Sequence, residues 1–107
     1  MTPMETYDAC IELQRSGKLP EAINALKQLT EEFPDFALTY NALAAIYKKQ
    51  GNVDVAIRNM EKYCELEPED SFGFSILSSY CLGAGRRDQA EEALGKAHDL
   101  RFKAQFG

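Results

Sequence analysis

The stretch ALTYNALAAIYKKQGNVDVAIRNMEKYCELEP (residues 37–68) holds two amphipathic helical patterns separated by a glycine. Leu43 and Tyr47 lie at helical spacing in its first half. Gly51 follows that half, and glycine ends helices because it takes up the left-handed conformation without steric cost. Pro68 closes the second half, since proline lacks the backbone donor that a helix interior needs. The stretch therefore predicts a helix–turn–helix unit.

The same unit recurs on both sides of this stretch at an interval of 34 residues. The interval is kept by four sets of positions, which are Gly17, Gly51 and Gly85; Ala22, Ala56 and Ala90; Leu26, Met60 and Leu94; and Pro34 and Pro68. A fixed interval of this length predicts an array of stacked helical units rather than a conventional globular domain. We therefore expect an all-α protein, an α-solenoid of about six antiparallel helices. Its single domain, residues 1–107, divides into units of about residues 3–36, 37–70 and 71–104.

Local signals mark where several of these helices begin. Thr2, Pro3 and Glu5 match a capping box with proline at the first helical position. Asp35 and Asp70 stand before the second and third units, where each can cap the helix that follows. The repeated alanines lie early in each second helix and face the helix before, where a small side chain permits close approach.

Composition argues against several classes of protein. The net charge is −5, and an acidic chain repels phosphate backbones, so we expect no nucleic-acid partner. No segment approaches the ~18 apolar residues of a membrane span, and we expect no membrane partner either. The start, MTPMETYDAC, lacks the basic and apolar regions of a signal peptide. We therefore expect a cytoplasmic protein that begins at Met1.

The charge is uneven along the chain. Residues 3–36 carry seven acidic and three basic side chains, residues 37–70 carry six and four, and residues 71–107 carry four and five. Such a gradient can orient an encounter with a partner, although solvated helix faces alone also produce it.

Residues that carry chemistry are few and scattered. Cys10, Cys64 and Cys81 are odd in number, lack C-x-x-C spacing and fall at packing positions, so we expect buried free thiols in a reducing compartment. His98 is the only histidine and has no cysteine or carboxylate arranged with it for nucleophilic work. The acidic clusters at the unit junctions lack the spacing and glycine of a calcium loop. We therefore expect no enzymatic activity, no metal and no cofactor.

These repeated positions resemble the tetratricopeptide repeat. The middle unit matches best, through Tyr40, Leu43, Ala44, Tyr47, Gly51, Ala56, Met60 and Pro68. The third unit departs further, with Phe102 where proline would stand, and the first is degenerate in its opening helix. The resemblance covers nearly the whole chain. It implies a right-handed superhelix whose concave groove is lined by the first helix of each unit, and a role in binding peptides or assembling proteins.

The resemblance also permits a test for the carboxylate clamp, by which some members grip the C-terminus of chaperone tails. That clamp needs Lys and Asn in the first unit, Asn in the second, and Lys and Arg in the third. The matching positions here hold Tyr7, Ile11, Ala42, Phe72 and Ile76. Apolar side chains neither neutralise a carboxylate nor donate hydrogen bonds to it, so no clamp of this kind is expected.

The same alignment predicts an apolar groove with cations at one end. Its expected lining is Tyr7, Ile11, Arg15, Leu38, Asn41, Ala42, Ala45, Lys48, Lys49, Phe72, Ile76 and Ser79. Exposed apolar patches mark binding surfaces, and we expect a ligand with an apolar helix or extended segment and an acidic residue near Lys48 and Lys49. The alternative is that Tyr7, Phe72 and Ile76 pack between units.

The C-terminal residues leave two further alternatives. Arg87 and Glu91 replace apolar residues of the earlier units, which makes the last helix more polar where a fourth unit would dock. Phe102 and Phe106 are four residues apart and share a face if the helix continues. They either fold back on the third unit or form a surface for weak self-association.

These patterns favour a non-enzymatic adaptor or scaffold that binds a protein or peptide partner in its groove. A secretion-type chaperone that shields an apolar export substrate is the first alternative. A structural module that stacks end to end is the second.

Overall fold

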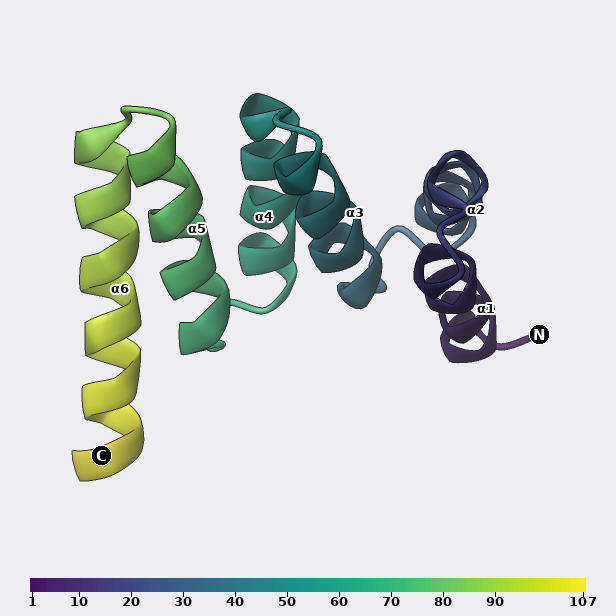
Figure 1. The fold of residues 1–107 in the computed structure, drawn as a ribbon. Coiled ribbons are helices and arrows are strands. Elements are labelled where there is room, and N and C mark those ends of the chain that lie inside the picture. The colour runs from purple at the N-terminus through teal and green to yellow at the C-terminus, as the bar shows by residue number, and fades with distance from the viewer.

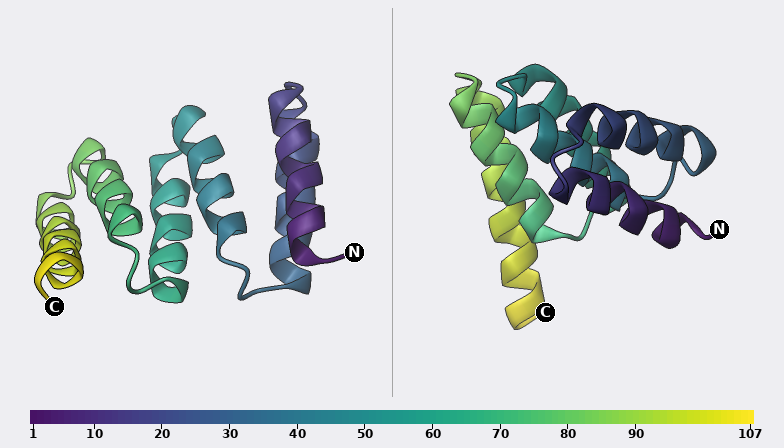
Figure 2. Two further views of the ribbon diagram at one scale, coloured as in Figure 1. Left: turned by 90° about the horizontal axis from the view of Figure 1, so that it is seen from below. Right: turned by 45° about the vertical axis from the view of Figure 1, so that its right-hand side comes forward.

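The computed structural model describes residues 1–107 as six α-helices joined by short turns (Figure 1). The helices are α1 (Pro3–Arg15), α2 (Leu19–Glu32), α3 (Leu38–Lys49), α4 (Val53–Leu66), α5 (Ser71–Gly83) and α6 (Arg87–Phe106). In the view from below, α3 to α6 follow one another in chain order, and α1 and α2 overlap at the other end of the row (Figure 2). The expected all-α solenoid is confirmed. No helix is both long and apolar enough to cross a membrane.

The turn within each unit has one conformation, repeated three times. Gly17, Gly51 and Gly85 have φ angles of 79°, 81° and 77°, in the left-handed region where a side chain is strained. In each turn the amide after the glycine donates to a carbonyl five residues earlier, as Asn52 does to Tyr47. The repeated glycines therefore end the first helix of each unit as the sequence predicts.

The helix caps follow the sequence at two of the three expected places. Thr2 and Glu5 form the complete capping box, and Asp70 accepts a hydrogen bond of 3.0 Å from the amide of Phe72. The expectation for Asp35 is wrong, because α3 begins after Ala37 and has no side-chain cap. A turn over Phe33–Phe36 holds Asp35 three residues before Leu38, the first residue of that helix.

The buried residues form two clusters, each shared by neighbouring units, rather than one central core. One buried cluster joins α3, α4, α5 and α6 and includes Ile57, Met60 and Leu77. A second joins α1, α2 and α3 and includes Leu26 and Leu43. Each unit therefore buries its apolar side against the next one, as a solenoid requires.

The three cysteines are buried and free, as expected. Burial raises the pKa of the Cys64 thiol to about 11. Burial raises the pKa values of Cys10 and Cys81 as well. Because the thiolate is the reactive form, all three serve as packing residues rather than nucleophiles.

Ala56 tests how closely the helices of one unit approach. It is fully buried early in α4, and a larger side chain there has no free volume to occupy. Replacing Ala56 with leucine is expected to lower the free energy of unfolding by roughly 1–3 kcal/mol through overpacking. Chemical denaturation measures this, and an unchanged midpoint would count against the close α3–α4 approach.

Candidate functional site

A pocket of about 420 Å³ lies at the turn end of the first two units. Ile11 of α1, Leu19 of α2 and Ile46 of α3 supply its apolar lining. Gln14, Arg15, Gly17 and Lys49 complete it. We call this the turn-end pocket. An apolar floor with a few polar groups at the edge is the usual composition of a binding site for a side chain or small ligand.

Two cations border the turn-end pocket. Arg15 ends α1 and Lys49 ends α3, and both side chains are exposed. Helix C-termini carry negative partial charge, which favours cations at these places. Arg15 lies 3.8 Å from Glu12, but both side chains are about three-quarters exposed, so this contact neutralises little of the charge. The pocket thus offers apolar contact beside positive charge.

The first helices of the second and third units continue this face. Lys48 of α3 lies over the ring of Tyr80 of α5, with its Nζ 5.9 Å from the ring centroid. Phe72, at the start of α5, is 72% exposed, and Ser79 is exposed on the same helix. An apolar side chain of that size in water marks a place for contact with another molecule.

Most predicted groove residues are more enclosed than the sequence suggested. Tyr7 and Ile11 are half-buried against the cluster of α1, α2 and α3, and Tyr7 makes an edge-to-face contact with Phe36 at 5.9 Å. Ile76 is half-buried against the cluster of α3 to α6. Tyr7 and Ile76 are therefore partly enclosed by buried side chains rather than fully open to solvent. Phe72 follows the groove expectation and stays exposed.

The prediction that Ala42 lines the groove is corrected by the structure. It is buried in the cluster with Cys10 and Leu43, because its side of α3 turns toward the first unit. It therefore does not line an open groove. Leu38, Asn41 and Ala45 of the same helix are partly exposed.

Sequence reasoning missed several residues that shape this face. Gln14, Leu19 and Ile46 line the turn-end pocket, Phe36 packs on Tyr7, and Tyr80 lies beneath Lys48. The 34-residue interval shows which residues occupy equivalent positions, but it does not give the distance between consecutive units. Leu19 carried a signal, because it begins the apolar side of the second helix.

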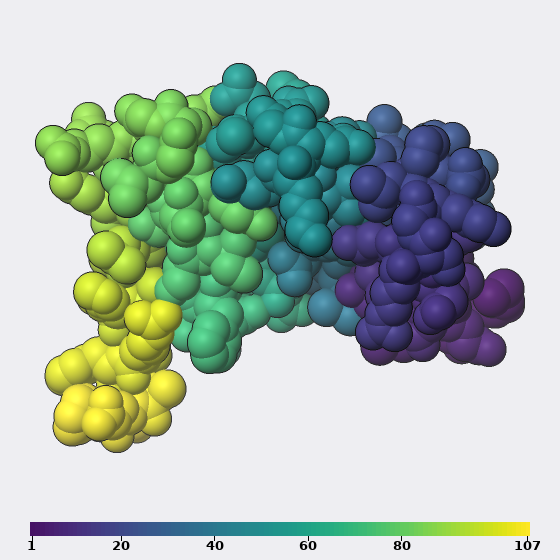
Figure 3. All heavy atoms as spheres, in the orientation of Figure 1, coloured from purple at the N-terminus to yellow at the C-terminus, as the bar shows by residue number.

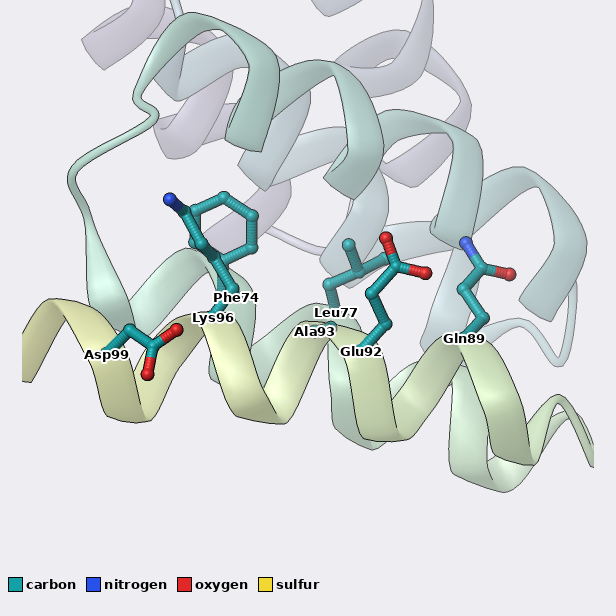
Figure 4. A pocket seen from close by; sticks show the side chains of 7 residues that line it. All are labelled: Phe74, Leu77, Gln89, Glu92, Ala93, Lys96 and Asp99. Atoms are coloured by element: carbon teal, nitrogen blue, oxygen red, sulfur yellow. The ribbon is translucent and has the colours of Figure 1, made fainter.

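A second hollow of about 390 Å³ lies along α5 and α6 (Figure 4). Phe74, Leu77 and Ala93 form its apolar part, while Gln89, Glu92, Lys96 and Asp99 project along one side of α6. Gln89 also donates a hydrogen bond of 2.9 Å to Glu61 of α4. Its border mixes acids, an amide and a cation, so it lacks the single sign of charge that the turn-end pocket has.

Phe102 and Phe106 do not fold back on the third unit, so the first of the two alternatives left by the sequence is wrong. Helix α6 continues to Phe106 and carries both rings beyond the end of α5, where Figure 3 shows it projecting from the body. The rings contact each other at 4.8 Å and are 65% and 68% exposed. Arg101 holds this end of α6 to α5 through a hydrogen bond to Ser75.

The model of the tetratricopeptide repeat family matches residues 37–70, the stretch that contains α3 and α4. The chain is a helical repeat protein of the tetratricopeptide type. A pentatricopeptide repeat-containing protein of Arabidopsis thaliana is 31% identical to this chain over 105 residues. These residues make up 97% of this chain and 14% of that relative. The chain thus spans only a small part of the curated relatives that it matches.

Solved structures share the tetratricopeptide fold at low sequence identity. MamA superposes with a TM-score of 0.88 at 23% identity, over 97% of this chain and 61% of MamA. The type III secretion translocator chaperone SycD of Yersinia enterocolitica gives 0.80 at 21% identity, over 97% and 83%. The second tetratricopeptide domain of Spaghetti (RPAP3), bound to an HSP90 peptide, gives 0.80 at 17% identity, over 92% and 91%. At these identities the likeness establishes the fold alone.

Proposed function

We propose that the chain is a non-enzymatic interaction module that binds an apolar, acidic segment of a protein partner across α1, α3 and α5. The turn-end pocket carries this proposal. An apolar side chain of the ligand enters against Ile11, Leu19 and Ile46, and a neighbouring carboxylate lies between Arg15 and Lys49. The segment then continues past Lys48 and Tyr80 toward Phe72, which supplies further apolar contact.

Two features support this type of partner, and a third bears on the compartment. Tetratricopeptide repeats are interaction repeats, and one structural neighbour was solved with a bound peptide. The carboxylate-clamp residues are absent, so the cations at the turn end are the ones available on this face. The buried free thiols fit a reducing compartment, and we place the protein in the cytoplasm on that ground.

Reversing both cations tests the proposed site. The double change Arg15→Glu with Lys49→Glu is expected to weaken capture of acidic, apolar peptides by roughly tenfold, because each exposed ion pair contributes about 0.2–1 kcal/mol. Fluorescence anisotropy against a peptide array measures this at two salt concentrations. The double change Arg58→Glu with Lys103→Glu, at exposed cations of α4 and α6, changes the net charge by the same amount and is the matched control. Equal binding by the double variant and the control would refute the proposal.

A secretion-type chaperone is the second candidate, favoured by the exposed side chains of Phe72 and Leu82. SycD is named as such a chaperone and shares this fold. A chaperone would suppress aggregation of a long apolar client without requiring the turn-end cations. Light scattering of an aggregating client, with wild type and the double variant, separates the two candidates.

A further inference from the structure

We propose that the turn-end pocket anchors one aromatic side chain of the partner, a phenylalanine or tyrosine that has a carboxylate beside it in the same segment. The site is the one proposed above, and its aromatic preference rests on that proposed function. The pocket lies at the junction between the first and second units, inside the array, because α1, α2 and α3 all contribute to its lining.

The second junction of the same chain has an aromatic side chain at the corresponding place. Ile46 forms part of the lining of the turn-end pocket, and the residue 34 positions later is Tyr80. From the same backbone position, a tyrosine ring reaches further than an isoleucine side chain. The ring of Tyr80 is therefore expected to extend into the place that corresponds to the pocket.

The neighbours of the Tyr80 ring agree with this correspondence. Lys48 has its Nζ 5.9 Å from the ring centroid, and Lys48 is the equivalent of Gln14, which lines the pocket. Val53 packs against the same buried cluster as Tyr80, and it is the equivalent of Leu19, a second lining residue. Burial raises the pKa of the Tyr80 phenol, so the hydroxyl end of the ring is enclosed as well. The chain supplies its own ring at the second junction, and a partner can supply one at the first.

The size and lining of the pocket suit a single ring. A cavity of about 150 Å³ lined by apolar side chains is large enough to bind benzene. The turn-end pocket has about 420 Å³, which leaves space for the backbone that carries the ring. Ile46 is 1% exposed, and Ile11 and Leu19 are half-buried. A ring that enters therefore exchanges water for apolar contact with all three side chains.

The cations at the border favour an aromatic side chain over an aliphatic one. Arg15 and Lys49 line the pocket and are exposed. A cation is attracted to the face of an aromatic ring, as Lys48 is to Tyr80 within the chain. The same cations attract a carboxylate. A phenylalanine or tyrosine beside an acidic residue uses both attractions, whereas a leucine in the same place uses only the second.

A series of peptides on the wild-type chain tests the aromatic anchor. Four fluorescein-labelled peptides share one acidic sequence and differ only at a central position between two glutamates, which holds tyrosine, phenylalanine, leucine or alanine. The tyrosine and phenylalanine peptides are expected to bind about 2- to 5-fold more tightly than the leucine peptide, through contact of a cation with the ring. They are expected to bind at least about tenfold more tightly than the alanine peptide, which fills little of the pocket. Fluorescence anisotropy measures these affinities.

Filling the pocket from within gives a second test. Ile46→Tyr gives the first junction the residue that the second junction has at Tyr80, and it is expected to lower the affinity for the tyrosine peptide to that for the alanine peptide. Asn24→Tyr is the matched control, because it adds the same ring on exposed α2 outside the pocket. Circular dichroism verifies that each variant keeps its helices. Leu19→Trp fills the pocket from a half-buried position and replaces Ile46→Tyr if that variant does not fold.

The outcomes separate this proposal from the proposed function. Suppose that the leucine peptide binds as tightly as the aromatic peptides, and that its binding still requires Arg15 and Lys49. The aromatic anchor is then overturned and the proposed function stands. A folded pocket-filling variant that binds the tyrosine peptide as wild type does also overturns the anchor. If the double change Arg15→Glu with Lys49→Glu alters the binding of none of the four peptides, both proposals are wrong.

Discussion

Replacing Ile57 with glutamate is expected to unfold the third unit, although glutamate occupies the equivalent position, Glu91, in the same chain. Ile57 is fully buried among Met60, Leu77 and Cys81. Loss of a buried aliphatic side chain costs about 2–5 kcal/mol. A carboxylate at that place either stays charged without a partner or takes up a proton, and both add to the cost. The sum approaches the whole stability of a small protein, about 5–15 kcal/mol.

Hydrogen exchange followed by mass spectrometry measures this effect segment by segment. Loss of protection is expected in α5 and α6 of Ile57→Glu, while α1 and α2 retain much of theirs, because units of a solenoid contact only their neighbours. The mirror variant Glu91→Ile is the control. It is expected to keep the fold, since Glu91 is exposed and its replacement displaces no buried group. If the free energy of unfolding of Ile57→Glu stayed within about 1 kcal/mol of the wild-type value, the packing between α4 and α5 would be contradicted.

The helices were predictable because their signals are local. A glycine in the left-handed conformation at Gly51 or a capping box at Thr2 depends on a few neighbouring residues, and the 34-residue interval repeats each signal. Asp35 was not predictable in this way. Whether it caps α3 depends on the turn over Phe33–Phe36, which sets how far the acid lies from the helix start.

The candidate site was predictable only in part, because it depends on how consecutive units are spaced. The sequence places Ile11 and Ala42 on the first helices, but their exposure is decided by the distance from α1 to α3. At that distance the turn-end pocket stays open beside Ile11, whereas Ala42 is buried between the helices. The sequence also places the cations Arg15 and Lys49 at one end of the face, and both lie at helix C-termini, which favour positive charge.

The end of the C-terminal helix α6 was predictable only in part, for a different reason. The sequence left open whether the last helix continues past residue 102; α6 continues to Phe106, and no proline stops it. The sequence alone did not decide between folding back and projection. A straight helix that runs past the end of α5 has no partner there to bury its rings, so Phe102 and Phe106 remain in water.

Replacing Gly73 with threonine, the residue at the equivalent position 39, is expected to lower the free energy of unfolding by about 3 kcal/mol. The new Cβ atom would lie 2.8 Å and 2.9 Å from two carbons of the Tyr63 ring. That ring cannot swing away freely, because its hydroxyl donates a hydrogen bond of 2.5 Å to Asp70. Gly95→Thr is the control, since a Cβ atom at Gly95 meets nothing within 4 Å.

The second change Tyr63→Leu completes the pair found at the first junction, Leu29 with Thr39. Leucine removes the ring that threonine would strike, so the double variant is expected to regain about 2 kcal/mol over Gly73→Thr alone. Urea denaturation of the four proteins gives the coupling energy between the two positions. Strict additivity would show that the sizes of these side chains do not set the junction.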